Sequence, residues 1–155
     1  SVLAGLLSLK QARDEDWVLV HDVARPLLRP NDVRELINAC AQDDVGGLLV
    51  HDVRDTMKQS RANSAGLRVE ATVPRAGLMH ALTPQLFRYG LLRDALLAAR
   101  ADGVVVTDES AAIERLGHRP RLVLGARDNI KITYADDLAL AAFYLSAQRA
   151  QGIYS

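Results

Sequence analysis

The chain has 155 residues, and its 19 Lys and Arg side chains balance 19 Asp and Glu side chains, so the formal net charge is zero. This length fits one domain, and the neutral balance gives no sign of the basic surface typical of nucleic-acid binding. The single cysteine, Cys40, excludes an internal disulfide and is typical of a reducing cytoplasm. With no apolar run long enough to span a membrane and no signal-peptide pattern, we expect a cytoplasmic protein.

The first residues have the spacing of an amphipathic helix. Apolar side chains recur at Val2, Leu3, Leu6 and Leu7, which predicts a helix ending near Arg13. A parallel sheet that begins with a helix has usually lost its first strand. We therefore expect residues 1–155 to be the later part of a longer chain.

The next segment predicts a buried strand with polar residues at its end. Four apolar residues, Trp17–Val20, are followed at once by His21 and Asp22. Asp22 and Arg25 then lie beyond the carboxyl end of the strand, where open α/β sheets bind ligands. Asp22 can hold a cation or a ribose hydroxyl, and Arg25 can hold an anion. The same two residues can instead form a pair that only stabilises a loop, and this stretch alone favours that interpretation.

A helix and a second strand follow. Asn31 and Asp32 are typical N-cap residues, and the helix that they precede is expected to turn Val33, Leu36, Ile37 and Cys40 inward. Gly46–Val50 is a short apolar strand. A helix between two buried strands is the βαβ pattern, which indicates a mostly parallel α/β sheet.

Residues 51–78 have a different pattern. Polar residues predominate up to Gly66, and Leu67–Val73 alternates between apolar and polar side chains, as in a half-exposed strand. The segment predicts a β-hairpin arm that projects and packs against a second copy of the chain. The alternative is an edge hairpin that lies on its own domain.

The remaining elements are predicted from local signals. Thr83–Pro84 is typical of a helix start, and a helix is expected through Ala101. Further on, the sequence predicts a buried strand at Val104–Val106, a helix from Thr107–Ser110 to Gly117, and strands at Arg121–Gly125 and Asn129–Thr133. A last helix is predicted to be capped by Thr133 and Asp136. Its inward residues are expected to be Leu138, Ala141, Ala142 and Leu145.

Polar residues collect at the predicted strand ends: Asp22, Arg25, Thr56, Lys58, Thr107, Asp108 and Lys131. Hydroxyls, cations and carboxylates at one sheet edge suit a phosphorylated ligand with Mg²⁺. Structural alternatives exist, since Thr107 or Asp108 can cap a helix and Lys131 can be a solvated edge residue. The histidines have no spacing for a zinc site, and no residue pattern supports a catalytic nucleophile.

Several motifs occur together and in order: Val20–Pro26, Val53–Lys58, Pro74–Leu78 followed by Thr83–Gln85, Thr107–Ser110, and Asp128–Thr133. With these motifs the chain resembles the 2-C-methyl-D-erythritol 4-phosphate cytidylyltransferase family over nearly all its length. The resemblance implies a Rossmann-like nucleotidyltransferase fold, with a mixed, mostly parallel sheet flanked by helices and a projecting β-arm. It implies one domain over residues 1–155 with an arm at 51–78, and a homodimer formed through that arm.

The resemblance also implies a reaction, in which CTP and methylerythritol phosphate are joined in the presence of Mg²⁺ and pyrophosphate is released. Asp22 would meet the ribose, the metal and the incoming phosphate, with Lys131 near the reacting phosphates. Ser1 and Val23 would bind the nucleotide. The acceptor substrate would be bound by Arg25, Thr56, Thr107 and, from the partner subunit, Arg75.

The Gly-rich loop and the catalytic Arg and Lys of the family precede the position that matches Ser1. We therefore expect the 155-residue chain to be inactive alone. Two alternatives remain: a non-catalytic dimerisation or regulatory remnant, and a related nucleotidyltransferase that acts on another sugar or alditol phosphate.

Overall fold

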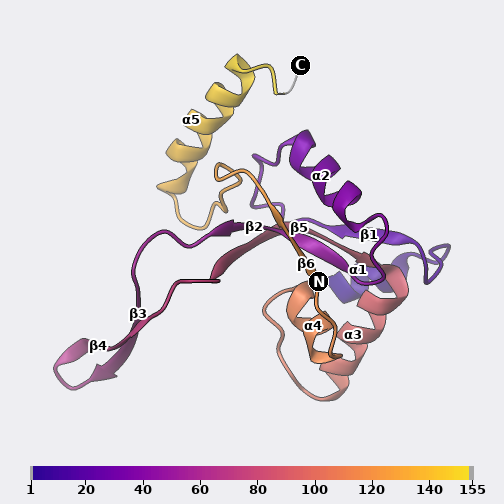
Figure 1. Ribbon diagram of the computed structural model, residues 1–155, viewed down its shortest axis with the longest axis horizontal. Helices are drawn as coiled ribbons and strands as arrows, with labels where there is room; N and C mark the ends of the chain where they lie inside the picture. The colour runs from indigo at the N-terminus through magenta and orange to yellow at the C-terminus, as the bar shows by residue number, and fades with distance from the viewer. Residues whose placement is uncertain (1, 154–155) are drawn as a thin grey trace.

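The computed structural model describes residues 2–153, which form an α/β domain with a projecting hairpin (Figure 1). No helix in this range is long and apolar enough to cross a membrane. The elements in chain order are α1 (Val2–Ser8), β1 (Trp17–Val20), α2 (Pro30–Cys40), β2 (Gly46–Asp52), β3 (Met57–Asn63), β4 (Gly66–Val73), β5 (Met79–Arg88), α3 (Tyr89–Ala101), α4 (Glu109–Arg115), β6 (Arg121–Leu124) and α5 (Asp137–Ala150).

The main sheet has the strand order β1-β5-β2-β6. β5 runs antiparallel to both β1 and β2, and β2 runs parallel to β6. β1, β2 and β6 therefore point the same way, which confirms the expected mixed, mostly parallel sheet. The βαβ pattern gave the right direction for β1 and β2, but the two strands are not neighbours because β5 lies between them.

The predicted helix start at Thr83–Pro84 is wrong, because both residues lie inside β5 and α3 begins only at Tyr89. A proline is unusual in a central strand because it has no N–H to donate. The pairing of β2 with β5 shifts register between Leu48 and Val50, beside the stretch of β5 that holds Pro84. This irregularity lets the sheet pass the proline without a regular ladder.

Two other predicted strands are absent. Val104–Val106 follows the turn at Gly103 and pairs with no strand among residues 2–153, and Val105 is 94% exposed. Asn129–Thr133 is also irregular, since the amide of Ile132 donates to Ala24 O rather than to a strand ladder. Both predictions relied on short runs of β-branched residues, which do not define a strand without a partner.

The core lies on both faces of the sheet. Successive residues of β5 point to opposite sides: Leu86 packs with α2, and Phe87 packs with α1, α3 and α4. Figure 1 shows α2 on one side of the sheet and α3 and α4 on the other. In α2 the buried residues are Asp32, Leu36 and Cys40, whereas Ile37 is exposed, so the inward face is rotated from the predicted one.

The expected hairpin is present as β3 and β4, which form a separate two-stranded sheet. Its strands are exposed along almost their whole length, and the hairpin stands away from the main sheet (Figure 1). Its tip is the Asn63–Gly66 turn.

The last helix departs from its predicted capping and packing. The Asp137 carboxylate, not that of Asp136, accepts hydrogen bonds from the backbone N–H groups of Thr133 and Tyr134. Of the four residues expected inward only Ala141 is buried, and Leu138 is 59% exposed. The buried Gln148 instead connects α5 to the rest of the domain by hydrogen bonds to Leu27 O and Asp128 Oδ2.

At Gly46 the strands β2 and β5 approach so closely that a side chain would not fit. A Cβ at Gly46 would lie 2.1 Å from Leu86 O, and the residue has φ of 113°. We expect Gly46→Ala to lower the free energy of unfolding by about 3 kcal/mol or more, since it adds a backbone clash to an unfavourable φ. Urea denaturation measures the loss.

Gly66→Ala is the matched control, because Gly66 has φ of 100° and nothing within 4 Å of its added Cβ. It should cost only about 1–2 kcal/mol. Equal losses in the two variants would contradict a steric limit at Gly46.

Candidate active site

A cavity of about 630 Å³ opens beyond the carboxyl end of β1. Its walls come from the loop after β1, from β5, from the start of α4, and from the loop between β6 and α5. Among the predicted residues it brings together Asp22, Val23, Arg25, Thr107, Asp108 and Lys131. Predicted strand ends were therefore a useful guide, although Thr107 and Lys131 do not follow strands.

Asp22 and Lys131 form an ion pair across the cavity mouth, with 2.7 Å between Lys131 Nζ and Asp22 Oδ2. The other carboxylate oxygen of Asp22 accepts a hydrogen bond from the N–H of Ala24 at 3.0 Å. The hydrogen bond from Lys131, followed by that from Ala24, holds the pKa of Asp22 below its usual range. Asp22 is thus ionised at neutral pH and fixed in direction.

Arg25 and Asp22 form no direct ion pair with each other, although their charges still interact. The Arg25 Nη1 group donates to Asn129 O at 2.8 Å. Its Nε is buried and has no hydrogen-bond partner in the described part of the chain. Burial lowers the pKa of the Arg25 guanidinium, although Asp22 opposes this effect. A desolvated guanidinium with a spare donor at a cavity wall is suited to an anion.

Thr83 of β5 holds the loop that carries Asp22. Its hydroxyl oxygen accepts a hydrogen bond from the N–H of Asp22 at 3.0 Å and lies 3.0 Å from His21 Nδ1. The other ring nitrogen of His21 lies 3.0 Å from Arg25 O. These contacts give His21 a structural role and fix the turn between His21 and Arg25.

At the opposite wall, Asp108 caps α4. Its Oδ1 accepts a hydrogen bond from the N–H of Ala111 at 2.8 Å, and its Oδ2 accepts one from Gln85 Nε2 at 3.0 Å. Asp108 is therefore structural, whereas no hydrogen-bond partner for the Thr107 side chain is present within residues 2–153. Burial raises the pKa of the neighbouring Glu109 carboxyl, and the negative charges of Asp108 and Asp22 add to the effect.

Sequence reasoning missed Gln85, Glu109 and Asn129. Gln85 is 1% exposed and lies in an apolar stretch of β5, and a buried amide among apolar residues is a signal of a specific hydrogen-bonding role. Glu109 is adjacent to Asp108 and Asn129 lies two residues before Lys131, but neither has a local pattern that separates it from an ordinary loop residue.

The cavity does not include Thr56, Lys58 or Arg75. Thr56 is exposed before β3, and Lys58 Nζ donates to Thr72 Oγ1 within the arm. Arg75 lies where β4 returns to the domain, at the base of the arm and not at its tip, and its guanidinium donates to Arg54 O. Ser1 lies outside the described residues.

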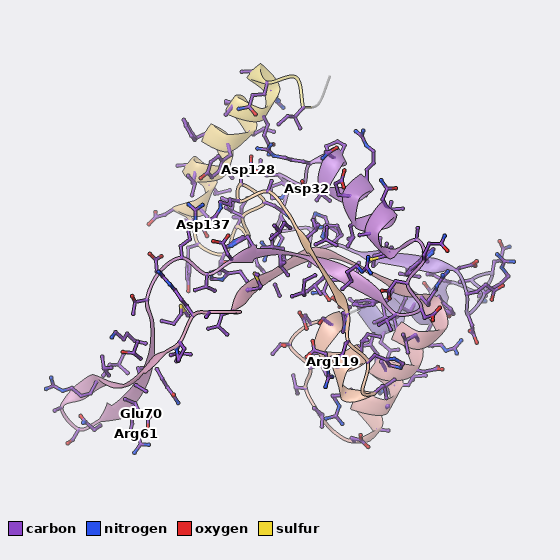
Figure 2. All side chains as sticks on the ribbon, in the orientation of Figure 1. Asp32, Arg61, Glu70, Arg119, Asp128 and Asp137 are labelled. Carbon is purple, nitrogen blue, oxygen red and sulfur yellow. The ribbon has the colours of Figure 1, made fainter. Side chains whose placement is uncertain are left out.

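A second polar cluster holds the loop that follows β6. Asp128 accepts hydrogen bonds from Arg29 Nε and Nη2 and from Gln148 Nε2, and Asp32 accepts one from the N–H of Ala126. Figure 2 shows Asp128 and Asp32 in the region between α2 and α5, far from the arm that carries Arg61 and Glu70. Both ends of the loop segment 126–128 are thus bonded to α2 or its N-terminal flank.

Comparison with known proteins identifies the family. Residues 1–147 match the family IspD, which is described as 2-C-methyl-D-erythritol 4-phosphate cytidylyltransferase. The chain belongs to this family. It is 51% identical over 148 residues to the family's protein from Paraburkholderia phytofirmans, covering 94% of this chain and 62% of that protein. It is 50% identical over 151 residues to the one from Klebsiella pneumoniae, covering 97% of this chain and 62% of that protein.

Solved structures of this family share the fold. A crystal structure of 4-diphosphocytidyl-2C-methyl-D-erythritol synthase superposes with a TM-score of 0.81 at 39% identity, covering 93% of this chain and 65% of that one. The Francisella tularensis 2-C-methyl-D-erythritol 4-phosphate cytidylyltransferase gives a TM-score of 0.83 at 33% identity, covering 93% and 66%. The chain spans about three-fifths of the length of its curated relatives.

The ion pair at the cavity mouth makes a prediction about pH. Lys131→Met should raise the pKa of the Asp22 carboxyl toward its ordinary value, because the hydrogen bond from Lys131 is the largest cause of its depression. A carboxyl with a depressed pKa stabilises the fold above its unfolded-state pKa, and this contribution is lost as the pH falls through the folded-state value. Acidification should therefore cost the variant less stability than the wild type.

Carbon-13 NMR titration of the Asp22 carboxyl and urea denaturation at neutral and acid pH measure the two effects. Lys58→Met is the control, since Lys58 bonds to Thr72 in the arm. An Asp22 titration curve that is the same in Lys131→Met and Lys58→Met would contradict the ion pair.

Proposed function

We propose that this chain forms the acceptor-binding side of a cytidylyltransferase that joins CTP to 2-C-methyl-D-erythritol 4-phosphate and releases pyrophosphate. The observation that carries the proposal is the cavity in which Asp22, Lys131, Arg25 and Thr107 converge, in a chain that belongs to this family. The product would be a precursor in isoprenoid synthesis by the non-mevalonate pathway.

In this proposal each cavity residue has a role that matches its chemistry. Arg25 and Thr107 bind the phosphate and hydroxyl groups of methylerythritol phosphate, and Thr56 contributes from the segment just before β3. Asp22, the backbone of Val23 and Ser1 face the nucleotide. Lys131 lies near the reacting phosphates, where its charge is delivered at a fixed point by the contact with Asp22.

The reaction needs little proton transfer. A phosphate oxygen of methylerythritol phosphate attacks the α-phosphorus of CTP, a new P–O bond forms, and the bond to the pyrophosphate leaving group breaks. Because the attacking phosphate is already an anion, the protein contributes by aligning the two substrates and balancing charge. Arg25 and Lys131 provide cations for this purpose.

Mg²⁺ is the metal that this chemistry implies. Each Asp22 oxygen accepts one hydrogen bond, which leaves a lone pair on each for a cation. Within residues 2–153 no group of three or more His, Cys, Asp or Glu side chains is placed to hold a metal. This donor set fits Mg²⁺, which is usually held by one or two carboxylates together with substrate phosphates. When bound, the ion would neutralise phosphate charge.

We further propose a cytoplasmic homodimer. The arm exposes Leu67 and Val69 on β4, and its two strands contact little else, so a second copy would bury apolar surface that one chain leaves in water. The buried free thiol of Cys40 is consistent with a reducing compartment.

The activity test uses a fused enzyme, in which residues 1–155 replace the matching segment of the Klebsiella pneumoniae relative. We expect it to release pyrophosphate from CTP and methylerythritol phosphate in the presence of Mg²⁺, and the 155-residue chain alone to release none. Asp22→Asn should lower kcat/KM at least about tenfold, or about 1.4 kcal/mol, because it removes the charge that orients Lys131 and Mg²⁺.

Asp136→Asn is the control, since the exposed Asp136 side chain makes no capping bond. A folded fused enzyme without activity would favour a non-catalytic dimerisation role. Activity with another alditol phosphate, but not with methylerythritol phosphate, would favour the related nucleotidyltransferase.

Arg75 allows a test of the dimer, since it lies at the base of the arm and outside the cavity of its own chain. We propose that Arg75 binds the acceptor phosphate in the partner's cavity. Arg75→Ala and Lys131→Ala, each inactive in the fused enzyme, should regain activity when their subunits are exchanged. In a mixed dimer one site would carry both lesions and the other neither.

If Arg75 serves its own subunit, every site in the mixture keeps one lesion and the activity stays absent. Mass spectrometry of the intact dimers verifies that subunits have exchanged. Verified exchange without recovered activity would eliminate the role in the partner's site.

A further inference from the structure

Two loops that bound the cavity and the central strand β5 meet at Asn129, a residue 1% exposed in the loop between β6 and α5. Its side-chain amide donates from Nδ2 to Thr83 O of β5 at 2.8 Å. Its backbone oxygen accepts from Arg25 Nη1, in the loop after β1, also at 2.8 Å. One residue thus joins two loops and the central strand.

Thr83 of β5, which accepts the Asn129 amide, also holds Asp22. Thr83 accepts the Asn129 amide at its backbone oxygen and the N–H of Asp22 at its hydroxyl oxygen. Two residues after Asn129, Lys131 reaches Asp22, and the N–H of Ile132 donates to Ala24 O at 2.8 Å. The relative placement of Lys131 and Asp22 therefore depends on two bonds to one strand residue.

We propose that Asn129 is a positioning residue, whose amide bond to Thr83 sets where the Arg25 guanidinium and the Lys131 ammonium are presented to the ligand. The effect on catalysis rests on the proposed function, whereas the effect on the loops does not. Asn129 itself does not line the cavity, so it acts through Arg25 and Lys131.

The donor of Asn129 is the part that matters. Its Oδ1 is buried without a hydrogen-bond partner in the described chain, so the side chain contributes through Nδ2 alone. Leu is similar in size but has no donor, and Asp would place a carboxylate oxygen against the Thr83 carbonyl. Because the site is buried, bulk water does not replace the lost donor, and the loop must move away from Thr83.

The first measurement is amide hydrogen exchange in the 155-residue chain carrying Asn129→Leu, with Asn129→Asp as a second variant in case the first does not fold. Exchange at the amides of Ile132 and Asp22 should accelerate at least about tenfold more than exchange in β2, which reports global opening. Ile113→Val, a buried change in α4, is the control and should accelerate all these amides alike. Uniform acceleration in the Asn129 variants would overturn the proposal.

The second measurement is steady-state kinetics in the fused enzyme. Asn129→Leu should raise KM for methylerythritol phosphate about fivefold or more and lower kcat, while KM for CTP stays within about twofold, since Arg25 faces the acceptor. Unchanged kinetics beside local acceleration of exchange would overturn the positioning role. Absence of activity in the unmutated fused enzyme would count against the proposed function only, because the exchange result would still decide the role of Asn129.

Discussion

β5 is the constraint on which the domain depends, because it is hydrogen-bonded to β1 on one side and to β2 on the other. Its register places Gln85 opposite both Val20 and Leu48, in the middle of the sheet. Phe87 and Leu86 enter the cores on opposite faces. The same strand provides Thr83 and Gln85 to the cavity, so the strand that completes the two cores also fixes both walls of the site.

The site gathers opposite charges from a chain that is neutral overall. Arg25 and Lys131 come from two loops, and Asp22, Asp108 and Glu109 face them across the same cavity. Both carboxylate oxygens of Asp108 accept hydrogen bonds, one from the N-terminus of α4 and one from Gln85, so its charge is largely satisfied by the fold. Arg25 is less satisfied, since its Nε is buried and has no hydrogen-bond partner among residues 2–153. An anionic ligand would therefore find a donor that the protein has already desolvated.

Local sequence patterns predicted those elements whose signals are local. Trp17–Val20 and the strands at Gly46 and Arg121 were found because an apolar run defines each of them within a few residues. The helix α2 was also found, but its N-cap position is Arg29 and not the predicted Asn31 or Asp32. β5 was missed because Thr83–Pro84 has a stronger local signal for a helix start than for a strand, and its pairing with residues 17–20 and 46–52 is long-range. Asp22, Arg25 and Lys131 were found as polar residues near predicted strand ends. Asn129 and Gln85 lie in the quoted motifs, but their roles become visible only when their hydrogen-bond partners are known.

The attachment of α5 has a consequence for how the domain opens. The helix leaves Leu138 and Phe143 largely in water, and Gln148 is its buried contact with Leu27 O and with Asp128. A helix bound through polar groups, with little apolar area removed from water, can separate at a lower free energy than the sheet it adjoins. Such an opening would take a hydrogen bond from Asp128, which lies in the same loop as Lys131. The last helix lines no part of the cavity, yet it helps to hold the loop that carries one of the cavity's two cations.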